Sequence, residues 1–172
     1  IRYTHIPNTK AQQKYGYIIE TEKGLHLLSD PYAKAIDKAL HYETPYSSEK
    51  SFSMPKCVVV DDAFDWQDVE KPRISREETV LFETHVKGLT KLNPNLNERE
   101  QGTYLGLYSP EMLAFYKQQN INSIQLLPVA ACMHEPHLLE MDKVNYWGYN
   151  PYLFMVPDPR YAKNDAVTEL KT

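Results

Sequence analysis

The feature that most constrains this chain is a strand–helix–strand pattern between residues 79 and 131. "TVLFETHV" (79–86) alternates in the way that predicts a strand. "INSIQLLPVAA" (121–131) is a nearly continuous apolar run, which is typical of a parallel strand buried on both faces. With a helix between them, these strands predict a right-handed parallel crossover. The expected fold class is therefore α/β.

The helix of this pattern is predicted at "SPEMLAFYKQQN" (109–120). Ser109 is an N-cap candidate, Pro110 suits the first turn, and Glu111 favours the positive end of the helix dipole. Asn120 is a plausible stop. We expect a long polar loop between the first strand and this helix.

The flanking segments predict less regular structure. "YGYIIETE" (15–22) alternates like a strand, and we expect a β-rich unit up to about residue 40. Further along the chain we expect a polar linker at 41–55 and a short strand or extended connector at 56–66. A second linker is expected at 69–78, and the first turns of a helix at 165–172.

Composition excludes several classes of function. The net charge is −4 with acids and bases interleaved, so neither nucleic acid nor a membrane surface is an expected partner. No apolar run is long enough to span a bilayer. The two cysteines form no framework and no leader is seen, so we expect a cytoplasmic protein. Because the chain starts at Ile1 without a methionine, we expect an upstream part to be absent.

The most unusual stretch is "NYWGYNPYLF" (145–154), which crowds aromatic rings around Gly148. It follows a predicted parallel strand, where α/β folds place ligand sites. Gly148 allows the backbone to turn, and Asn150-Pro151 favours a further turn. Exposed tyrosine rings can lie against a sugar ring, and equally the loop can plug a core. Composition alone favours the plug.

Three other groups of side chains are weaker candidates. Residues 132–137 could ligate a metal through Cys132, His134, Glu135 and His137, but Pro136 interrupts helical register, and a solvent-exposed loop is the preferred interpretation. Carboxylates on the connector suggest acid/base work or, more simply, a solvated turn: Asp61, Asp62, Asp65, Asp68 and Glu70. Glu83 and His85 share a face of the first strand, where structural pairing is favoured over a ligand role.

Several segments together resemble the bacterial glycogen debranching enzymes of isoamylase type, in the α-amylase clan of glycoside hydrolases. "HVKGLT" (85–90) and "NYWGYNP" (145–151) are the most specific of them. The others are "LLSDPYAKAID", "PKCVVVDDAFDW", "GTYLGL" and "INSIQLLPV", in the same order along the chain. Where many relatives have His after the second strand, this chain has Ala130.

The resemblance implies a fold of two parts. Residues 1–55 would be the tail of a β-sandwich domain like a carbohydrate-binding module, with its linker. Residues 56–78 would be a connector, and 79–172 the start of a (β/α)8 TIM barrel with its first two strands. A complete barrel needs about 250 residues. An exposed edge after the second strand makes self-association an expected property.

The resemblance also implies a site and a reaction. Tyr149 would stack on the sugar, supported by Tyr146 and Trp147. The reaction would be retaining hydrolysis of α-1,6 branch linkages of glycogen or limit dextrin, with every catalytic carboxylate outside this chain. No cofactor or metal is implied. Alternatives are a branching or trehalose-releasing enzyme of the same clan, a non-catalytic glucan-binding protein, or a piece with no function of its own.

Overall fold

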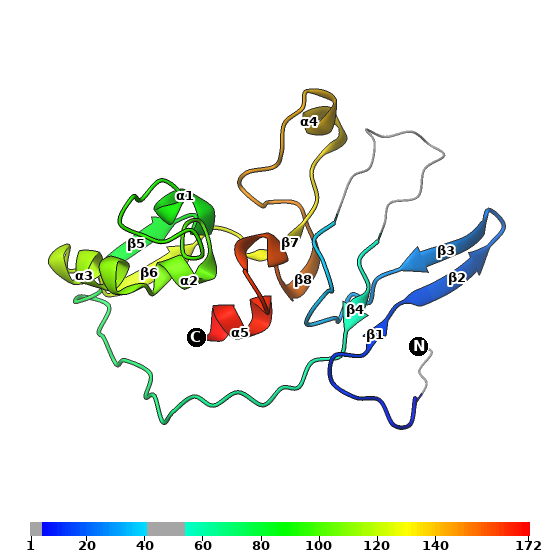
Figure 1. Ribbon diagram of the computed structural model, residues 1–172, viewed down its shortest axis with the longest axis horizontal. Helices are drawn as coiled ribbons and strands as arrows, with labels where there is room; N and C mark the ends of the chain where they lie inside the picture. Colours follow the sequence, from blue (N-terminus) through cyan, green and yellow to red (C-terminus); the bar gives the residue numbers. More distant parts are fainter. Residues whose placement is uncertain (1–4, 41–53) are drawn as a thin grey trace.

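The computed structural model describes residues 5–40 and 54–172, in three groups of elements (Figure 1). One group contains β5, β6 and the helices α1 to α3, a middle group contains β7, β8 and α5, and a third contains β1 to β4. The linker predicted at 41–55 falls almost wholly outside the described residues. No helix in the described part of the chain is long and apolar enough to cross a membrane.

The predicted parallel crossover is present. β5 (Leu81–Thr84) pairs in parallel with β6 (Ser123–Leu126), with Leu81 opposite Ser123. The segment between them contains α1 (Val86–Thr90), α2 (Tyr104–Leu107) and α3 (Pro110–Gln118). The prediction of an α/β arrangement is thus confirmed, but β6 is only partly covered, not buried on both faces.

The helix α3 begins and ends where its sequence predicts. The Ser109 hydroxyl accepts a hydrogen bond from the Met112 backbone N–H at 3.3 Å, and Pro110 occupies the first turn. Asn120 has φ of 55°, a left-handed conformation that asparagine tolerates and that ends the helix.

The predicted polar loop after β5 is wrong, because α1 and α2 lie within it. Long-range contacts hold these short helices in place. The buried Thr90 Oγ1 accepts a hydrogen bond from the Gly102 N–H at 2.9 Å. The Tyr104 ring is buried beside Val86. Local propensity cannot specify helices of this length, so packing has to stabilise them.

The apolar run 121–131 forms two strands and not one. β6 ends before Pro128, which has no N–H to donate to a ladder. The chain then enters β7 (Ala130–Cys132), which pairs antiparallel with β8 (Pro151–Pro157). The turn predicted at Asn150-Pro151 is therefore wrong, because Pro151 opens a strand. The second predicted helix is present as α5 (Ala166–Lys171), with Asp165 as its N-cap.

The N-terminal group is made of two small antiparallel pairs. β2 (Tyr17–Thr21) and β3 (Gly24–Leu28) form a hairpin with exposed side chains, which confirms the predicted strand. β1 (Lys14–Tyr15) pairs with β4 (Cys57–Val58). Cys57 is fully buried against Ala131 and Leu153, so the beginning of the predicted connector packs on the β7–β8 pair. Beyond β4 the chain runs as an extended trace to β5 (Figure 1).

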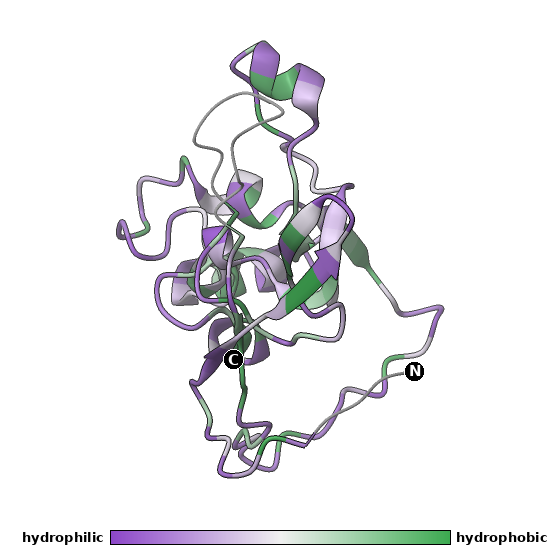
Figure 2. Cartoon of the chain, turned by 90° about the vertical axis from the view of Figure 1, so that its right-hand side faces the viewer, coloured by the Kyte–Doolittle hydropathy of each residue, from purple (hydrophilic) through white to green (hydrophobic). Residues whose placement is uncertain are grey.

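The hydrophobic core is divided among three small clusters. Hydrophobic and hydrophilic segments alternate along much of the chain (Figure 2). One cluster joins β4 to β7 and β8, one joins α1 and α2 to the 3-10 helix Pro159–Tyr161, and one lies under α3. Their buried members are Ala33, Cys57, Ala131, Leu153 and Val156; Val86, Tyr104 and Tyr161; and Leu96, Met112 and Tyr116. The middle cluster supports the candidate site.

Candidate glucan-binding site

The aromatic loop, residues 145–149, connects α4 (Pro136–Glu140) to β8 through a turn at Gly148. Gly148 has φ of +81°, which strains any other residue. A Cβ at this position would lie 3.0 Å from the Pro128 carbonyl oxygen. The Asn145 Oδ1 accepts a hydrogen bond from the Gly148 N–H at 2.8 Å. The loop therefore lies directly on the segment that joins β6 to β7.

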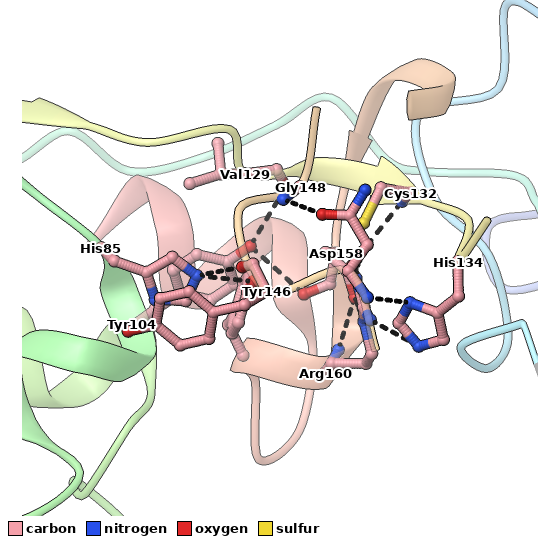
Figure 3. A network of polar contacts seen from close by, with 11 residues as sticks. His85, Tyr104, Val129, Cys132, His134, Tyr146, Gly148, Asp158 and Arg160 are labelled. Carbon is pink, nitrogen blue, oxygen red and sulfur yellow. Dashed lines mark hydrogen bonds and ion pairs between the residues drawn. The ribbon is translucent and has the colours of Figure 1, made fainter. Parts of the chain in front are cut away.

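His85 fixes the inner side of the aromatic loop (Figure 3). Its ring stacks on Tyr146 with the ring centroids 4.1 Å apart, and its Nε2 lies 2.8 Å from the Tyr146 carbonyl oxygen. Its Nδ1 accepts a hydrogen bond from the Gly88 N–H at 3.0 Å and so caps α1. Since Nδ1 accepts, the proton of the neutral ring resides on Nε2 and is donated to Tyr146. Burial lowers the pKa of His85 and favours this neutral form.

Two tyrosines extend this support into the core. The Tyr161 ring meets His85 edge-on at 5.5 Å and Tyr104 edge-on at 5.9 Å. The Tyr104 hydroxyl donates to the Asp158 carbonyl oxygen at 3.2 Å. Burial raises the pKa values of both phenols, so both stay protonated. The aromatic loop is thereby connected to α2 and to the end of β8.

An ion pair lies behind this aromatic stack. The Asp158 carboxylate, which is buried, accepts from the Nε of Arg160 at 3.0 Å and from its Nη2 at 2.7 Å. The Nη2 also contacts the Cys132 sulfur at 2.7 Å, and Nη1 lies 3.3 Å from His134 Nε2 (Figure 3). Burial lowers the pKa of His134, and the neighbouring guanidinium lowers it further. This network joins β7 to the turn after β8.

The contacts of residues 132–137 account for the cluster that sequence offered as a metal site. Cys132 and His134 contact Arg160, and the Asn145 amide donates to the Glu135 carboxylate at 2.8 Å. Among the residues that the structure describes, no three His, Cys, Asp or Glu side chains are grouped to hold a metal ion. The expected exposed loop is partly wrong, because Cys132 is buried and Pro136 opens the helix α4.

The three aromatic residues that were singled out for substrate binding face different surroundings. Tyr149 is 69% exposed and Trp147 is 56% exposed, whereas the Tyr146 ring packs on His85. Trp147 meets Tyr146 edge-on at 5.5 Å. The Tyr146 side chain is still 43% exposed, so the plug interpretation fits it only in part, and Tyr149 plugs no core.

The remaining candidates lie apart from the aromatic loop or differ from expectation. His85 is not on the first strand but caps α1, and Glu83 accepts from the Gln125 amide at 2.8 Å across the parallel pair. On the connector, Asp62 is exposed and pairs with Lys34 at 2.5 Å. The other connector acids are also exposed: Asp61, Asp65, Asp68 and Glu70.

Sequence reasoning missed Asp158, Arg160 and Tyr161, although a signal for the turn was present. In "PDPRY" (157–161), Asp158 directly precedes Pro159, a pattern typical of an N-cap followed by a proline in the first turn. The short 3-10 helix Pro159–Tyr161 begins there. The Asp158 carboxylate accepts from the Arg160 N–H at 2.9 Å. The partners of Arg160 on β7 have no local signal in the sequence.

Comparison with solved structures defines the class to which this fold and site correspond. The catalytic module of SpuA, a multi-modular glycogen-degrading pneumococcal virulence factor, is 26% identical with a TM-score of 0.68, over 92% of this chain and 24% of that one. The type I pullulanase from Bacillus subtilis, solved with maltose, is 25% identical with a TM-score of 0.60, over 91% and 22%. The structural neighbours are enzymes of the α-amylase family.

Within that class the match by sequence is more particular. The glycogen debranching enzyme of Serratia proteamaculans is 37% identical over an alignment that covers 94% of this chain and 27% of that protein. The chain is thus a homologue of the glycogen debranching enzymes and spans about a quarter of the length of the curated relatives that it matches. No protein-family model matches the chain.

Proposed function

We propose that this chain is part of an isoamylase-type glycoside hydrolase that removes α-1,6 branches from glycogen or limit dextrin. The observation that carries this proposal is the 37% identity to a glycogen debranching enzyme along nearly the whole chain. In this proposal β5 and β6 are the first two strands of a (β/α)8 barrel. The β2–β3 hairpin belongs to the tail of a β-sandwich domain, with boundaries at 1–55, 56–78 and 79–172.

The proposed mechanism is retaining, with two carboxylates about 5 Å apart as nucleophile and acid/base. We place neither of them in this chain. In support, two acids of the loop and of the network behind it already have structural partners: Asp158 binds Arg160, and Glu135 binds Asn145. The 172-residue chain alone is therefore expected to release no reducing sugar from limit dextrin. Release above the level of a buffer blank would contradict this placement.

The contribution of this chain is one wall of the sugar site, with Tyr149 as the stacking ring. Its exposure leaves the ring face available to the C–H face of a glucose unit. Gly148, Asn145 and His85 hold the loop from below, so the platform is preorganised. Tyr146 and Trp147 support the platform.

Titration calorimetry with maltohexaose tests this role. Tyr149→Ala removes a stacking contact of about 1–3 kcal/mol, by analogy with aromatic platforms for flat rings, and so weakens binding by about 5- to 150-fold. The matched control is Tyr32→Ala, because Tyr32 is also exposed, at 79%, but lies in the N-terminal group. Equal losses in the two variants, or none in Tyr149→Ala, would contradict the proposed platform.

A cytoplasmic location is also proposed. Cys57 and Cys132 are both free and buried, as expected for a protein that folds in a reducing compartment.

A further inference from the structure

A cationic cavity lies beside the aromatic loop and has no role in the function proposed above. Its volume is about 240 Å³, and it lies between α1 and the segment that follows β8. Four cationic side chains line it, Lys87, Lys91, Arg160 and Lys163, and none of its lining residues is Asp or Glu. Asn145 and Tyr146 are shared between this lining and the aromatic loop.

The three lysines of the cavity are exposed, and none of them has an acidic partner within the described residues. In residues 5–40 and 54–172 the ion pairs join Lys14 to Asp37, Lys34 to Asp62 and Arg160 to Asp158. Within that part of the chain, none involves a lysine of the cavity. Lys87 and Lys91 are also four residues apart at α1, a spacing at which like charges repel each other. A bound anion would relieve this repulsion between two exposed lysines.

The nearby acids offset the positive charge of the cavity only in part, because Asp158 and Glu169 are two carboxylates beside four cationic side chains. Asp158 balances only Arg160. The Glu169 carboxylate is buried behind the cavity and accepts from the backbone N–H groups of Lys163 and Asn164 at 3.1 and 2.8 Å. After burial, the charges of Lys87 and Arg160 are the next causes that lower the pKa of His85. The charges of Lys87 and Arg160 thus act on His85, which also lines the cavity.

The lysine stems are held against the backbone at Gly102. This residue has φ of +73°, and a Cβ there would lie 3.1 Å from Lys91 Cδ and 3.3 Å from Lys87 Cγ. Gly102 is itself fixed by its hydrogen bond to Thr90. Packing of both stems on one backbone position reduces the rotamer freedom that binding would otherwise have to remove.

We propose that this cavity binds a phosphate monoester, carried by an α-glucan chain or by a free sugar phosphate. A phosphate monoester is a compact anion of nearly two charges, which suits three ammonium groups acting as point charges. The cavity is smaller than the roughly 300–1,000 Å³ of sites that enclose a whole small ligand, so it accepts the anionic group and leaves the sugar outside. The sugar would then lie toward Tyr146.

Calorimetry with three ligands tests the inference: maltohexaose, mono-phosphorylated maltohexaose and glucose 6-phosphate. We expect the phosphorylated maltohexaose to bind at least about tenfold more tightly than the neutral one, and the preference to fall as NaCl rises from about 0.05 to 0.5 M. The double variant Lys87→Ala/Lys91→Ala removes most of the preference. The control Lys117→Ala, an exposed lysine on α3, leaves it unchanged.

The outcomes separate this inference from the glucan proposal. Tighter binding of the phosphorylated maltohexaose than of glucose 6-phosphate assigns the phosphate to a glucan chain, and equal binding assigns it to a free metabolite; both support the site. Equal binding of phosphorylated and neutral maltohexaose, or an equal loss in Lys117→Ala, overturns it. Tyr149-dependent binding of neutral maltohexaose would stand in either case.

Discussion

His85→Ala is expected to destabilise the fold and release the aromatic loop. The change removes the cap on the Gly88 N–H, the hydrogen bond to the Tyr146 carbonyl and the stacked ring pair. Each contact contributes about 1 kcal/mol. Because His85 is buried, a cavity adds to the loss, and we expect the free energy of unfolding to fall by about 3–4 kcal/mol. That is a large part of the roughly 5–15 kcal/mol of a typical domain.

Urea unfolding followed by circular dichroism measures this loss, with His137→Ala as the matched control. His137 is exposed on α4, so its removal changes stability by no more than about 0.5 kcal/mol. His85→Asn keeps a capping oxygen and loses the stack, so it should fall between the wild type and His85→Ala. A loss below about 0.5 kcal/mol in His85→Ala would refute the reasoning that this ring holds the loop to α1.

Three further predictions concern charge and assembly. The folded-state pKa values of His85 and His134 lie below the usual value of about 6.5, so their stabilising effect is complete above that pH and is lost as the pH falls through the folded-state values. The urea midpoint should therefore drop on acidification, and it should drop less steeply in His85→Ala. The same dependence on pH in His85→Ala and the wild type would contradict this. Asp158→Asn leaves a partly buried Arg160 without its counter-ion and should lower the free energy of unfolding in urea by about 2–3 kcal/mol. Asp62→Asn, in an exposed pair, should lower it by less than about 1 kcal/mol. Equal losses in the two variants would refute the structural role of the Asp158–Arg160 pair. The two-stranded β5–β6 sheet has open edges, so the chain should self-associate with concentration in analytical ultracentrifugation, and a clean monomer at high concentration would exclude it.

The fold could be predicted from sequence wherever one local signal decides the structure. The helix at 110–118 has an N-cap at Ser109, a first-turn proline at Pro110 and a C-terminal stop at Asn120, and all three act as predicted. The parallel pairing of 81–84 with 123–126 follows from apolar runs on either side of that helix. In contrast, α1 and α2 are too short to be specified locally, and they depend on contacts such as that of Thr90 with Gly102.

Proline was the residue most often misinterpreted. Pro136 was taken to interrupt a helix, yet at the first position of a helix its missing N–H costs nothing. Pro128 lies within an apolar run that looks continuous, and there it separates two strands that pair with different partners. In both cases the effect of the ring depends on its position within the element, and hydrophobicity alone does not reveal that position.

The candidate site was predictable in its exposed part and not in its support. The aromatic residues around Gly148 drew attention to the loop, but they favoured a core plug, and only the family resemblance singled out Tyr149, which is open to solvent. His85 lies 61 residues before Tyr146, and no periodicity links the two. The alternating pattern instead placed His85 on the strand beside Glu83. Only the folded chain reveals that the ring caps α1 and carries the loop.

The central claim, that the aromatic loop binds α-glucan, is tested most directly by mapping maltohexaose on the chain with NMR chemical shifts. We predict that the largest changes on titration fall on residues 145–149, with a ring-current shift of the Tyr149 side-chain resonances that is absent in Tyr149→Ala. Changes concentrated on the exposed β2–β3 hairpin or around Tyr32, with 145–149 unmoved, would contradict it.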